Sequence, residues 1–456
     1  MSRVLVAKTS FTAGELDPQL LGRLDLKAQE DGAARLLNVL VQATGGVTRR
    51  PGLARVAALP GAKRLIGFEA PSGPVLVALA PGRVDILRDG VTLATLPGAW
   101  DEARLRDIAW ARAGDELLLV HPDVEPRSLA ETEPGAFALR AWRYDASDAE
   151  TPPTRTYLPY ARFAPSRVAL ELRHPASGET DVELPAGGVY LVASQPVFDP
   201  LHLGVVFRHR GREVTVVSVD AGDRTRASGM LHEAAPDGNA TRDWDEQAFS
   251  GYRGWPATVT VYQDRLVIGG SRGLPDWLWM SRTGRHFDFE LSDPDPKIGV
   301  LDDHAIALRL TAGELHAVRA LQPGRQLQVF TSAGEWIVGG SPLTPTTVEV
   351  GLQTRVGSWG KRRVQPVDVD GATLFVGASG RELREYLFAE SEQAYQAADI
   401  ALLARHLLRD PTDMTFDGRR RLLLIPRDDG RAAAVTIERN SNVVAWSLLG
   451  TAGRVL

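Results

Sequence analysis

The stretch KRLIGFEAPSGPVLVALAPGRVDILRDGVTLATL, residues 63–96, determines the predicted fold class of this chain. It contains short runs rich in Val, Ile and Leu, which are separated by Pro-Ser-Gly, Pro-Gly and Asp-Gly. Such runs, bounded by turn residues, are typical of β-strands. The pair Asp89-Gly90 stands between two alternating runs and predicts a tight hairpin turn. The stretch therefore predicts a group of short antiparallel strands.

The same form returns several times along the chain. Residues 108–123 repeat it with Gly114-Asp115 at the turn, and residues 258–271 repeat it with Gln263-Asp264. Further copies cover 325–340, 364–388 and 420–449. Units of three or four short strands, spaced by tens of residues, suggest the blades of a propeller. We therefore expect a mainly β protein with an irregular β-propeller.

Other regions depart from this pattern. Apolar residues at helical spacing predict one short helix at 25–37 and a second at 389–408. Residues 144–245 are polar and rich in turn residues, yet they contain strand-like runs, which predicts a β-rich domain inserted into the propeller. We expect four parts in chain order: an N-terminal arm with a helix (1–60), a first set of blades (61–143), the inserted domain (144–245) and a second set of blades (246–456).

Composition limits the class of function. The chain has 456 residues, 44% of them hydrophobic, a formal net charge of −5 and no cysteine. A net negative charge supplies no overall attraction to nucleic acid or to acidic lipid. The absence of cysteine excludes disulfides, thiolate metal sites and a cysteine nucleophile. The N-terminus lacks the apolar core of a signal peptide, and no apolar run is long enough to span a bilayer, so we expect assembly in a bacterial cytoplasm.

No catalytic signature selects a reaction. The chain has no His-Glu-x-x-His, and nothing selects a facing carboxylate pair for glycoside hydrolysis. The runs DDHA (302–305) and SDPDP (292–296) could supply metal ligands, but loops are the favoured interpretation. His406 is interpreted as a core or interface histidine. We predict no catalytic, cofactor-binding or metal-binding residue and therefore no enzyme.

Two basic stretches need a separate explanation. NVLVQATGGVTRRPG (38–52) is no phosphate-binding loop, because no Gly-Lys-[Ser/Thr] follows; it predicts a turn flanked by solvated or interfacial arginines, with Pro51-Gly52 as a candidate type II turn. QTRVGSWGKRRVQP (353–366) places a tryptophan among cations, which suits either a phosphate backbone or a loop paired to a neighbour. The loop is the favoured interpretation, and RRR (419–421) is interpreted as a hairpin flank.

Ordered sequence blocks resemble a family of tailed-phage virion proteins. The opening SFTAGELDPQLLGRLDL (10–26) and NVLVQATGGVTRRPG resemble the N-terminal signature of that family. The resemblance continues in residues 261–289, 324–388, 395–408 and 435–449, and covers most of the chain outside 144–245. The family includes the tail nozzle of short-tailed phages, and the bases of head spikes on gene transfer agents are similar.

The resemblance implies an architecture and a set of contacts. It implies an irregular β-propeller, a platform and an inserted domain that docks fibres, without enzymatic activity or cofactor. The implied partners are a portal or adaptor protein or a capsid vertex, a fibre or spike protein and further copies of the chain, with DNA only if the protein lines a tail channel. The candidate interface residues are Arg49, Arg50, Arg355, Trp359, Lys361, Arg362 and Arg363.

Alternatives stay open at this stage. Many members of the family continue well past the VAW strand, whereas this chain stops at Leu456, so a nozzle and a spike base are nearly equal expectations. Either role places the protein in the virion, at the tail or at a capsid vertex. A protein that binds or depolymerises capsule polysaccharide is the alternative from another functional class, with a host capsule polysaccharide as its partner.

Overall fold

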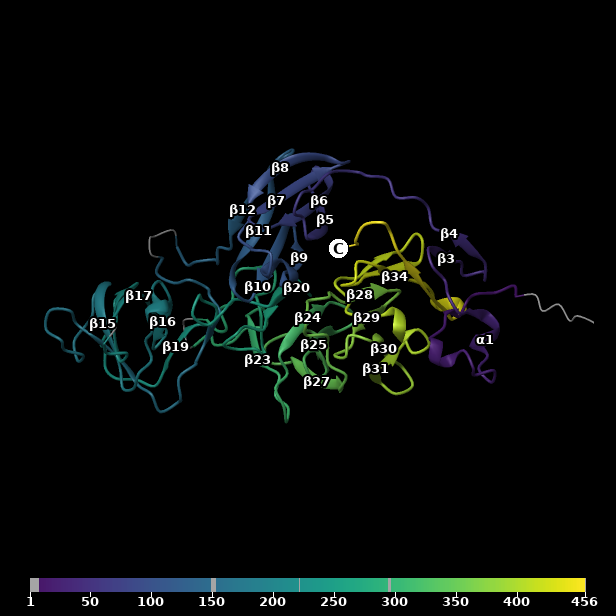
Figure 1. Cartoon of the computed structure of the whole chain (residues 1–456). Coiled ribbons are helices and arrows are strands. Elements are labelled where there is room, and N and C mark those ends of the chain that lie inside the picture. The colour runs from purple at the N-terminus through teal and green to yellow at the C-terminus, as the bar shows by residue number, and fades with distance from the viewer. Residues whose placement is uncertain (1–7, 149–152, 221, 294–296, 456) are drawn as a thin grey trace, which may run out of the picture. The chain divides into compact units, whose positions relative to one another are not determined.

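The computed structural model describes residues 8–148, 153–220, 222–293 and 297–455, and almost all of its regular structure is β-strand (Figure 1). Six antiparallel sheets have four strands each, in sequence order from one edge to the other. This is the form of propeller blades. The chain is therefore mainly β, with six blades of the β-propeller type, as the sequence predicts.

The strands of the six blades have the following bounds. The first blade contains β5 (Arg64–Ala70), β6 (Gly73–Ala80), β7 (Arg83–Arg88) and β8 (Val91–Pro97), and the second contains β9 (Ala109–Ala113), β10 (Glu116–His121), β11 (Val124–Glu133) and β12 (Ala136–Ala141). The third contains β20 (Thr258–Tyr262), β21 (Arg265–Gly269), β22 (Trp277–Met280) and β23 (Ile306–Arg309), and the fourth contains β24 (Val318–Gln322), β25 (Leu327–Thr331), β26 (Glu335–Gly339) and β27 (Glu349–Thr354). The fifth contains β28 (Val367–Val369), β29 (Ala372–Val376), β30 (Leu383–Ala389) and β31 (Ala394–Asp399), and the sixth contains β32 (Thr415–Asp417), β33 (Leu422–Pro426), β34 (Ala432–Glu438) and β35 (Val443–Leu449).

Short turns shape these blades. Asp89 and Gly90 both have positive φ, and they join β7 to β8 in the register Arg88↔Val91. Two consecutive positive φ angles match the right-handed twist of a tight hairpin. Gln263 and Asp264 do the same between β20 and β21. These predicted turns are confirmed.

The chain forms two compact units, which we describe separately. The first unit comprises residues 1–109, 312–338 and 350–456, and it holds the first, fifth and sixth blades and almost all of the fourth. One of its core clusters contains the buried Trp446. The second unit comprises residues 110–311 and 339–349 and holds the third blade, nearly all of the second and a seven-stranded antiparallel sheet.

The seven-stranded sheet coincides with the region predicted as an insertion, 144–245, and extends two residues beyond it. Its strand order is β13-β19-β16-β17-β18-β15-β14. The strands are β13 (Tyr160–Ala161), β14 (Leu170–Arg173), β15 (Gly187–Ala193), β16 (Val206–His209), β17 (Arg212–Val219), β18 (Arg226–Leu231) and β19 (Trp244–Gln247). It has its own core, in which Phe207 stacks on Trp244 at a ring-centroid distance of 6.1 Å.

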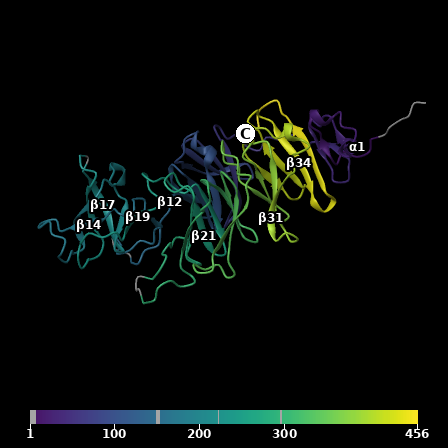
Figure 2. The same ribbon diagram turned by 90° about the horizontal axis from the view of Figure 1, so that it is seen from below.

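The N-terminal segment packs on the sixth blade. It contains β1 (Gly14–Glu15), α1 (Ala28–Asp31), β2 (Gly32–Ala33), β3 (Val39–Val41) and β4 (Val47–Arg49), and it lies beside β34 in two views (Figures 1 and 2). Asn38 N–H donates to the Leu448 carbonyl at 2.8 Å. Thr436 donates its hydroxyl to the Val41 carbonyl at 2.6 Å. Segments 395 or more residues apart in sequence therefore share one small core.

Both predicted helices are wrong in extent. In 25–37, only Ala28–Asp31 is α-helical, because the next residues extend and bury Leu36 against the sixth blade. In 389–408, Ala394–Asp399 pairs with β30 as a strand, and only a three-residue 3-10 turn follows at Arg405–Leu407. Tertiary packing overrides the weak helical propensity of such sequences.

The other 3-10 turns are Pro18–Leu20, Arg104–Asp107, Pro200–His202 and Arg439–Ser441. Within the described residues, no helix is long and apolar enough to cross a membrane.

Candidate interaction site

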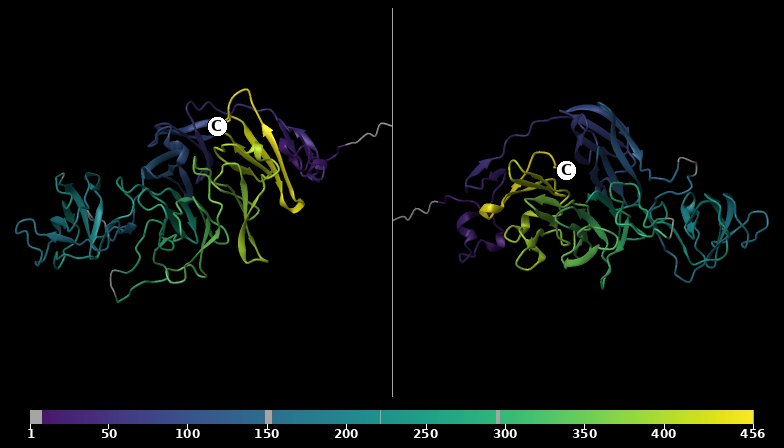
Figure 3. Two further views of the ribbon diagram at one scale, coloured as in Figure 1. Left: turned by 60° about the horizontal axis from the view of Figure 1, so that its bottom comes forward. Right: turned by 180° about the vertical axis from the view of Figure 1, so that it is seen from behind.

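The Gly-Gly stretch forms the predicted turn. Gly45 has a φ of 100°, and the hairpin between β3 and β4 closes with Val41 opposite Val47. A type II turn at Pro51-Gly52 would require a positive φ at Gly52. Gly52 is not among the residues with positive φ, so the predicted turn does not form. The chain continues instead as an exposed connection to β5, which is visible in Figures 1 and 3. We call residues 51–60 the basic strap.

The basic strap is exposed and makes few contacts. Leu53 is 77% exposed and Val56 is 76% exposed. Within the described residues, 52–58 form no hydrogen bond. The strap crosses the β7–β8 turn, where a Cβ on Gly90 would lie 2.8 Å from the Val56 carbonyl oxygen. An extended backbone with unpaired polar groups and exposed apolar side chains is typical of a segment that binds another chain.

The two predicted interface arginines beside the strap differ. Arg50 is tied within the chain: its Nε donates to Asn38 Oδ1 at 2.9 Å, and its Nη2 donates to the Gly450 carbonyl at 3.1 Å. Arg49 is exposed on β4, and its side chain has no partner among the described residues. Of this pair, Arg49 is therefore the residue that is free to bind another molecule.

Charge is distributed unevenly along the chain. Between residues 32 and 68 there are six Lys and Arg residues and no Asp or Glu. The first unit has 31 Lys and Arg against 26 Asp and Glu, a net charge of +5. The second unit has 21 against 31, a net charge of −10. The basic strap thus belongs to a basic unit, and the same chain carries an acidic one.

The second predicted group, on residues 355–363, divides into an outer and an inner set. Arg355 lies 3.8 Å from Glu314, and Lys361 lies 3.0 Å from Asp410, and these two cations are well exposed. Trp359 is partly buried and covers Gly380, where a Cβ would meet the indole ring at 2.4 Å. Arg362 and Arg363 are partly buried. The outer cations thus match the favoured interpretation of a loop with paired charges.

Arg363 belongs to an inner cluster that the sequence alone did not reveal. We define the arginine cluster as Arg64, Arg106, Arg319, Arg362 and Arg363. Arg363 Nη1 donates to the Arg319 carbonyl at 2.6 Å, and Arg64 Nη2 donates to the Arg363 carbonyl at 3.4 Å. Arg64 also donates to the Ile108 carbonyl at 2.9 Å, and its Nε lies 3.5 Å from Asp413. The guanidinium groups of Arg64, at the start of β5, and of Arg363, before β28, thus join segments distant in sequence.

Burial and like charge both act on these guanidinium groups. Burial lowers the pKa of Arg363 to about 10, and nearby Arg64 and Arg319 act in the same direction, while Asp107 opposes them. Burial also lowers the pKa of Arg362, with Arg106 as the next cause. Both residues still carry a full positive charge at neutral pH. The cluster is therefore a site of concentrated positive charge.

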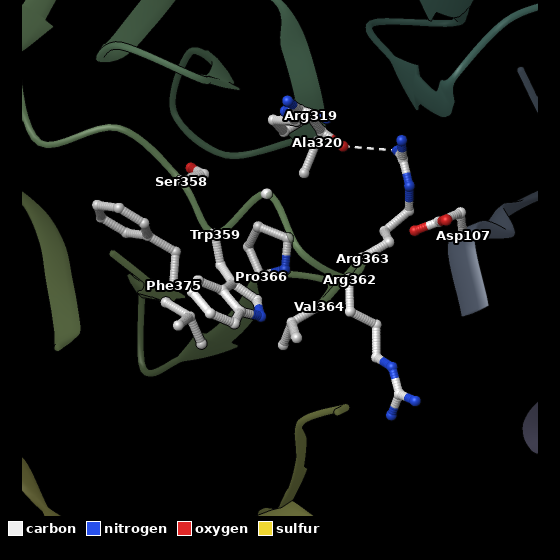
Figure 4. Close-up of a pocket in the computed structure, with 12 residues that line it drawn as sticks. Asp107, Arg319, Ala320, Ser358, Trp359, Arg362, Arg363, Val364, Pro366 and Phe375 are labelled. Atoms are coloured by element: carbon white, nitrogen blue, oxygen red, sulfur yellow. Dashed lines mark hydrogen bonds between the residues drawn. The ribbon is translucent and has the colours of Figure 1, made fainter. Parts of the chain in front are cut away.

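A small cavity lies beside the cluster (Figure 4). It is lined by Asp107, Arg319, Trp359, Arg362 and Arg363, among others. Its volume of about 30 Å³ is enough for about two water molecules, so no drug-sized ligand fits inside.

Three other features from the sequence are accounted for by local contacts. His406 Nε2 lies 3.0 Å from Glu15 Oε1, which makes it a contact between the 3-10 turn Arg405–Leu407 and the N-terminal segment. In DDHA, Asp303 pairs with Arg282, and His304 Nδ1 accepts from Leu301 N–H at 2.7 Å. Part of SDPDP, residues 294–296, lies outside the described residues. The RRR stretch flanks a hairpin, as predicted, with backbone amides bonded to Asp417.

Comparisons with known proteins add little beyond the fold. No protein-family model and no curated protein matches the chain. Apo AztD from Citrobacter koseri is 11% identical, with 85% of this chain and 86% of that chain covered and a TM-score of 0.35. BBS1N, solved in complex with ARL6DN, is 12% identical, with 85% of this chain and 95% of that chain covered and a TM-score of 0.31. The Cps50 (Swd1) β-propeller domain of Myceliophteria thermophila is 10% identical, with 87% of this chain and 88% of that chain covered and a TM-score of 0.29. No argument about function rests on likenesses this distant.

Proposed function

We propose that this protein is a non-enzymatic structural component of a tailed phage or of a gene transfer agent. It acts as a β-propeller hub that joins the particle to receptor-binding fibres or spikes, either as a nozzle-like tail component or as a head-spike base. The ordered sequence blocks that resemble this family support the proposal, and a mainly β chain with propeller blades is the fold that the resemblance implies.

The observation that carries the proposal is the basic strap. Its exposed Leu53 and Val56 and the backbone of residues 52–58, which forms no hydrogen bond among the described residues, suit burial against another protein. Burying each of these side chains stabilises a complex by about 1.5–3 kcal/mol. Exposed apolar side chains beside unpaired backbone groups are expected of a segment that another subunit covers.

Opposite charge in the two units supports further copies of the chain as partners. A strap from a unit of net charge +5 is complementary to a unit of net charge −10 in the next copy. Contact between different surfaces of identical copies is heterologous, and such contacts build rings when the rotation closes. A ring-shaped hub or base is the expected product.

Location in the particle is the test. We would tag the protein, purify the particles that carry it and locate the tag by electron microscopy. Label at the tail supports the nozzle-like role, and label at the capsid vertices supports the spike base. Absence of label from every particle would overturn the proposal.

A further inference from the structure

The arginine cluster has more positive charge than its surroundings neutralise. The acidic groups that act on Arg64, Arg362 and Arg363 are Asp107, Asp413 and Asp428, three carboxylates against the five guanidinium groups of the cluster. Within the described residues, the guanidinium groups of Arg106, Arg319 and Arg362 form no hydrogen bond and no ion pair. The surplus is therefore about two positive charges.

Hydrogen-bond donors beside the cavity also lack acceptors. Trp359 Nε1, Ser358 Oγ and the Nε atoms of Arg319 and Arg363 are buried without a partner in the structure. Three of these four groups can only donate a hydrogen bond. Buried polar groups in proteins are nearly always paired, and these four groups line one cavity, where an acceptor-rich molecule would satisfy them.

The side chains diverge around the cavity. Figure 4 shows Arg362 and Arg363 pointing in opposite directions, with the Trp359 indole nitrogen on the side of Arg362. Arg363 is already bonded to the Arg319 carbonyl. Arg362 and Trp359 are consequently the two groups that remain available to one ligand.

We propose that this cavity binds a phosphate group, with Arg362 and the Trp359 indole N–H as its direct contacts. A phosphate monoester carries about −1.5 to −2 charges at neutral pH, which matches the surplus, and its oxygens fit the fork of a guanidinium. The cavity of about 30 Å³ admits about two oxygen atoms, so the remainder of the ligand stays outside. Arg106 and Arg319 add attraction without direct contact. This site does not depend on the virion role.

Two sources supply phosphate oxygens: a free phosphate, with about −1.5 to −2 charges, and the diester phosphates of a nucleic-acid backbone, with one charge each. One arm of the test measures binding of inorganic phosphate to the full chain by calorimetry. The other measures binding of a short DNA duplex over a range of salt concentrations. A backbone ligand gives a steep loss of affinity with salt, whereas a chain that binds only the small anion gives no duplex binding.

The variants are Arg362→Gln, Arg362→Lys and the control Arg381→Gln. Arg381 is exposed on the fifth blade and its side chain likewise has no partner among the described residues. We expect Arg362→Gln to lower affinity for the bound ligand by roughly tenfold, Arg362→Lys to lower it less, and Arg381→Gln to leave it unchanged. Circular dichroism checks that each variant is folded. An indole N–H resonance that moves on ligand addition and is missing in Trp359→Phe would identify the second contact.

Two results overturn the proposal. One is the absence of binding by the wild-type chain in both arms. The other is binding that Arg362→Gln and Arg381→Gln reduce equally, which would indicate only general attraction to a basic surface.

Discussion

Glu335 makes the stability of the first unit depend on pH. It lies on β26 and is fully buried. Its Oε2 accepts from the Thr354 hydroxyl and from Val356 N–H, the latter at 3.3 Å, whereas its Oε1 has no partner. Burial raises the pKa of Glu335 from 4.5 to about 7, and the hydrogen bonds from Thr354 and Val356 and the charge of Arg384 oppose that rise only in part. The folded protein thus favours the neutral carboxyl.

The direction of the pH effect follows from this difference. Below pH 4.5 the carboxyl is protonated in both the folded and the unfolded chain, and its contribution to stability is fully present. As pH rises from 4.5 to about 7, the unfolded chain releases the proton first, and stability falls. The gap between 4.5 and about 7 corresponds to about 3 kcal/mol, all of it lost above the folded pKa.

The perturbation is Glu335→Gln, which keeps one oxygen acceptor and removes the ionisable group. Denaturant unfolding of both proteins at pH 5 and at pH 8 gives the difference in free energy of unfolding. We expect the variant to gain about 2–3 kcal/mol relative to the wild type between these pH values. Glu392→Gln, at an exposed residue of the fifth blade, is the control and shows no such gain. A Glu335→Gln difference that is the same at both pH values would refute the reasoning.

Three further predictions concern the N-terminal segment and the basic strap. Gly14→Ala destabilises the protein by roughly 2–4 kcal/mol in thermal unfolding, because its φ is 71° and the new Cβ would lie 2.2 Å from Trp446 N; the matched Gly22→Ala, where nothing lies within 4 Å, leaves the midpoint unchanged. Arg50→Ala increases amide exchange in the N-terminal segment by roughly tenfold, since about 1–2 kcal/mol of hydrogen bonding is lost, and unchanged exchange would contradict the assigned contacts. Arg55→Glu reduces self-association of the chain, measured as its mass in light scattering, and the reduction is larger at low salt. A mass equal to that of the wild type would show that the strap takes no part in self-association.

Local signals predicted the blades well. Asp89-Gly90 and Gln263-Asp264 demand tight turns by their own backbone preferences, and the strands on each side alternate or are continuously apolar. Each blade consists of consecutive strands, so neighbours in sequence are neighbours in the sheet. Such short-range information is what a single sequence contains.

Long-range contacts account for the errors. Residues 25–37 have helical spacing, but the sixth blade binds Leu36 in an extended conformation, and nothing near Leu36 in the sequence indicates this. The predicted interface group included Arg362 and Arg363 but missed Arg64 and Arg319, which come from other blades. The signal available in the sequence was a charged residue, Arg64, at the start of an apolar strand, and this signal does not specify which residues Arg64 contacts. Whether the predicted residues form an interface stays a prediction.

The pairing of the N-terminal segment with the sixth blade has a consequence for synthesis on the ribosome. Arg50 and its acceptor Gly450 are separated by 400 residues, and the second unit is translated between the first blade and the rest of the first unit. At about 5–20 residues per second, the nascent N-terminal segment waits roughly 20–80 s before the strand that completes its core leaves the ribosome. During that interval its apolar residues and the edges of β3 and β4 are open to other chains, including neighbours on the same messenger RNA.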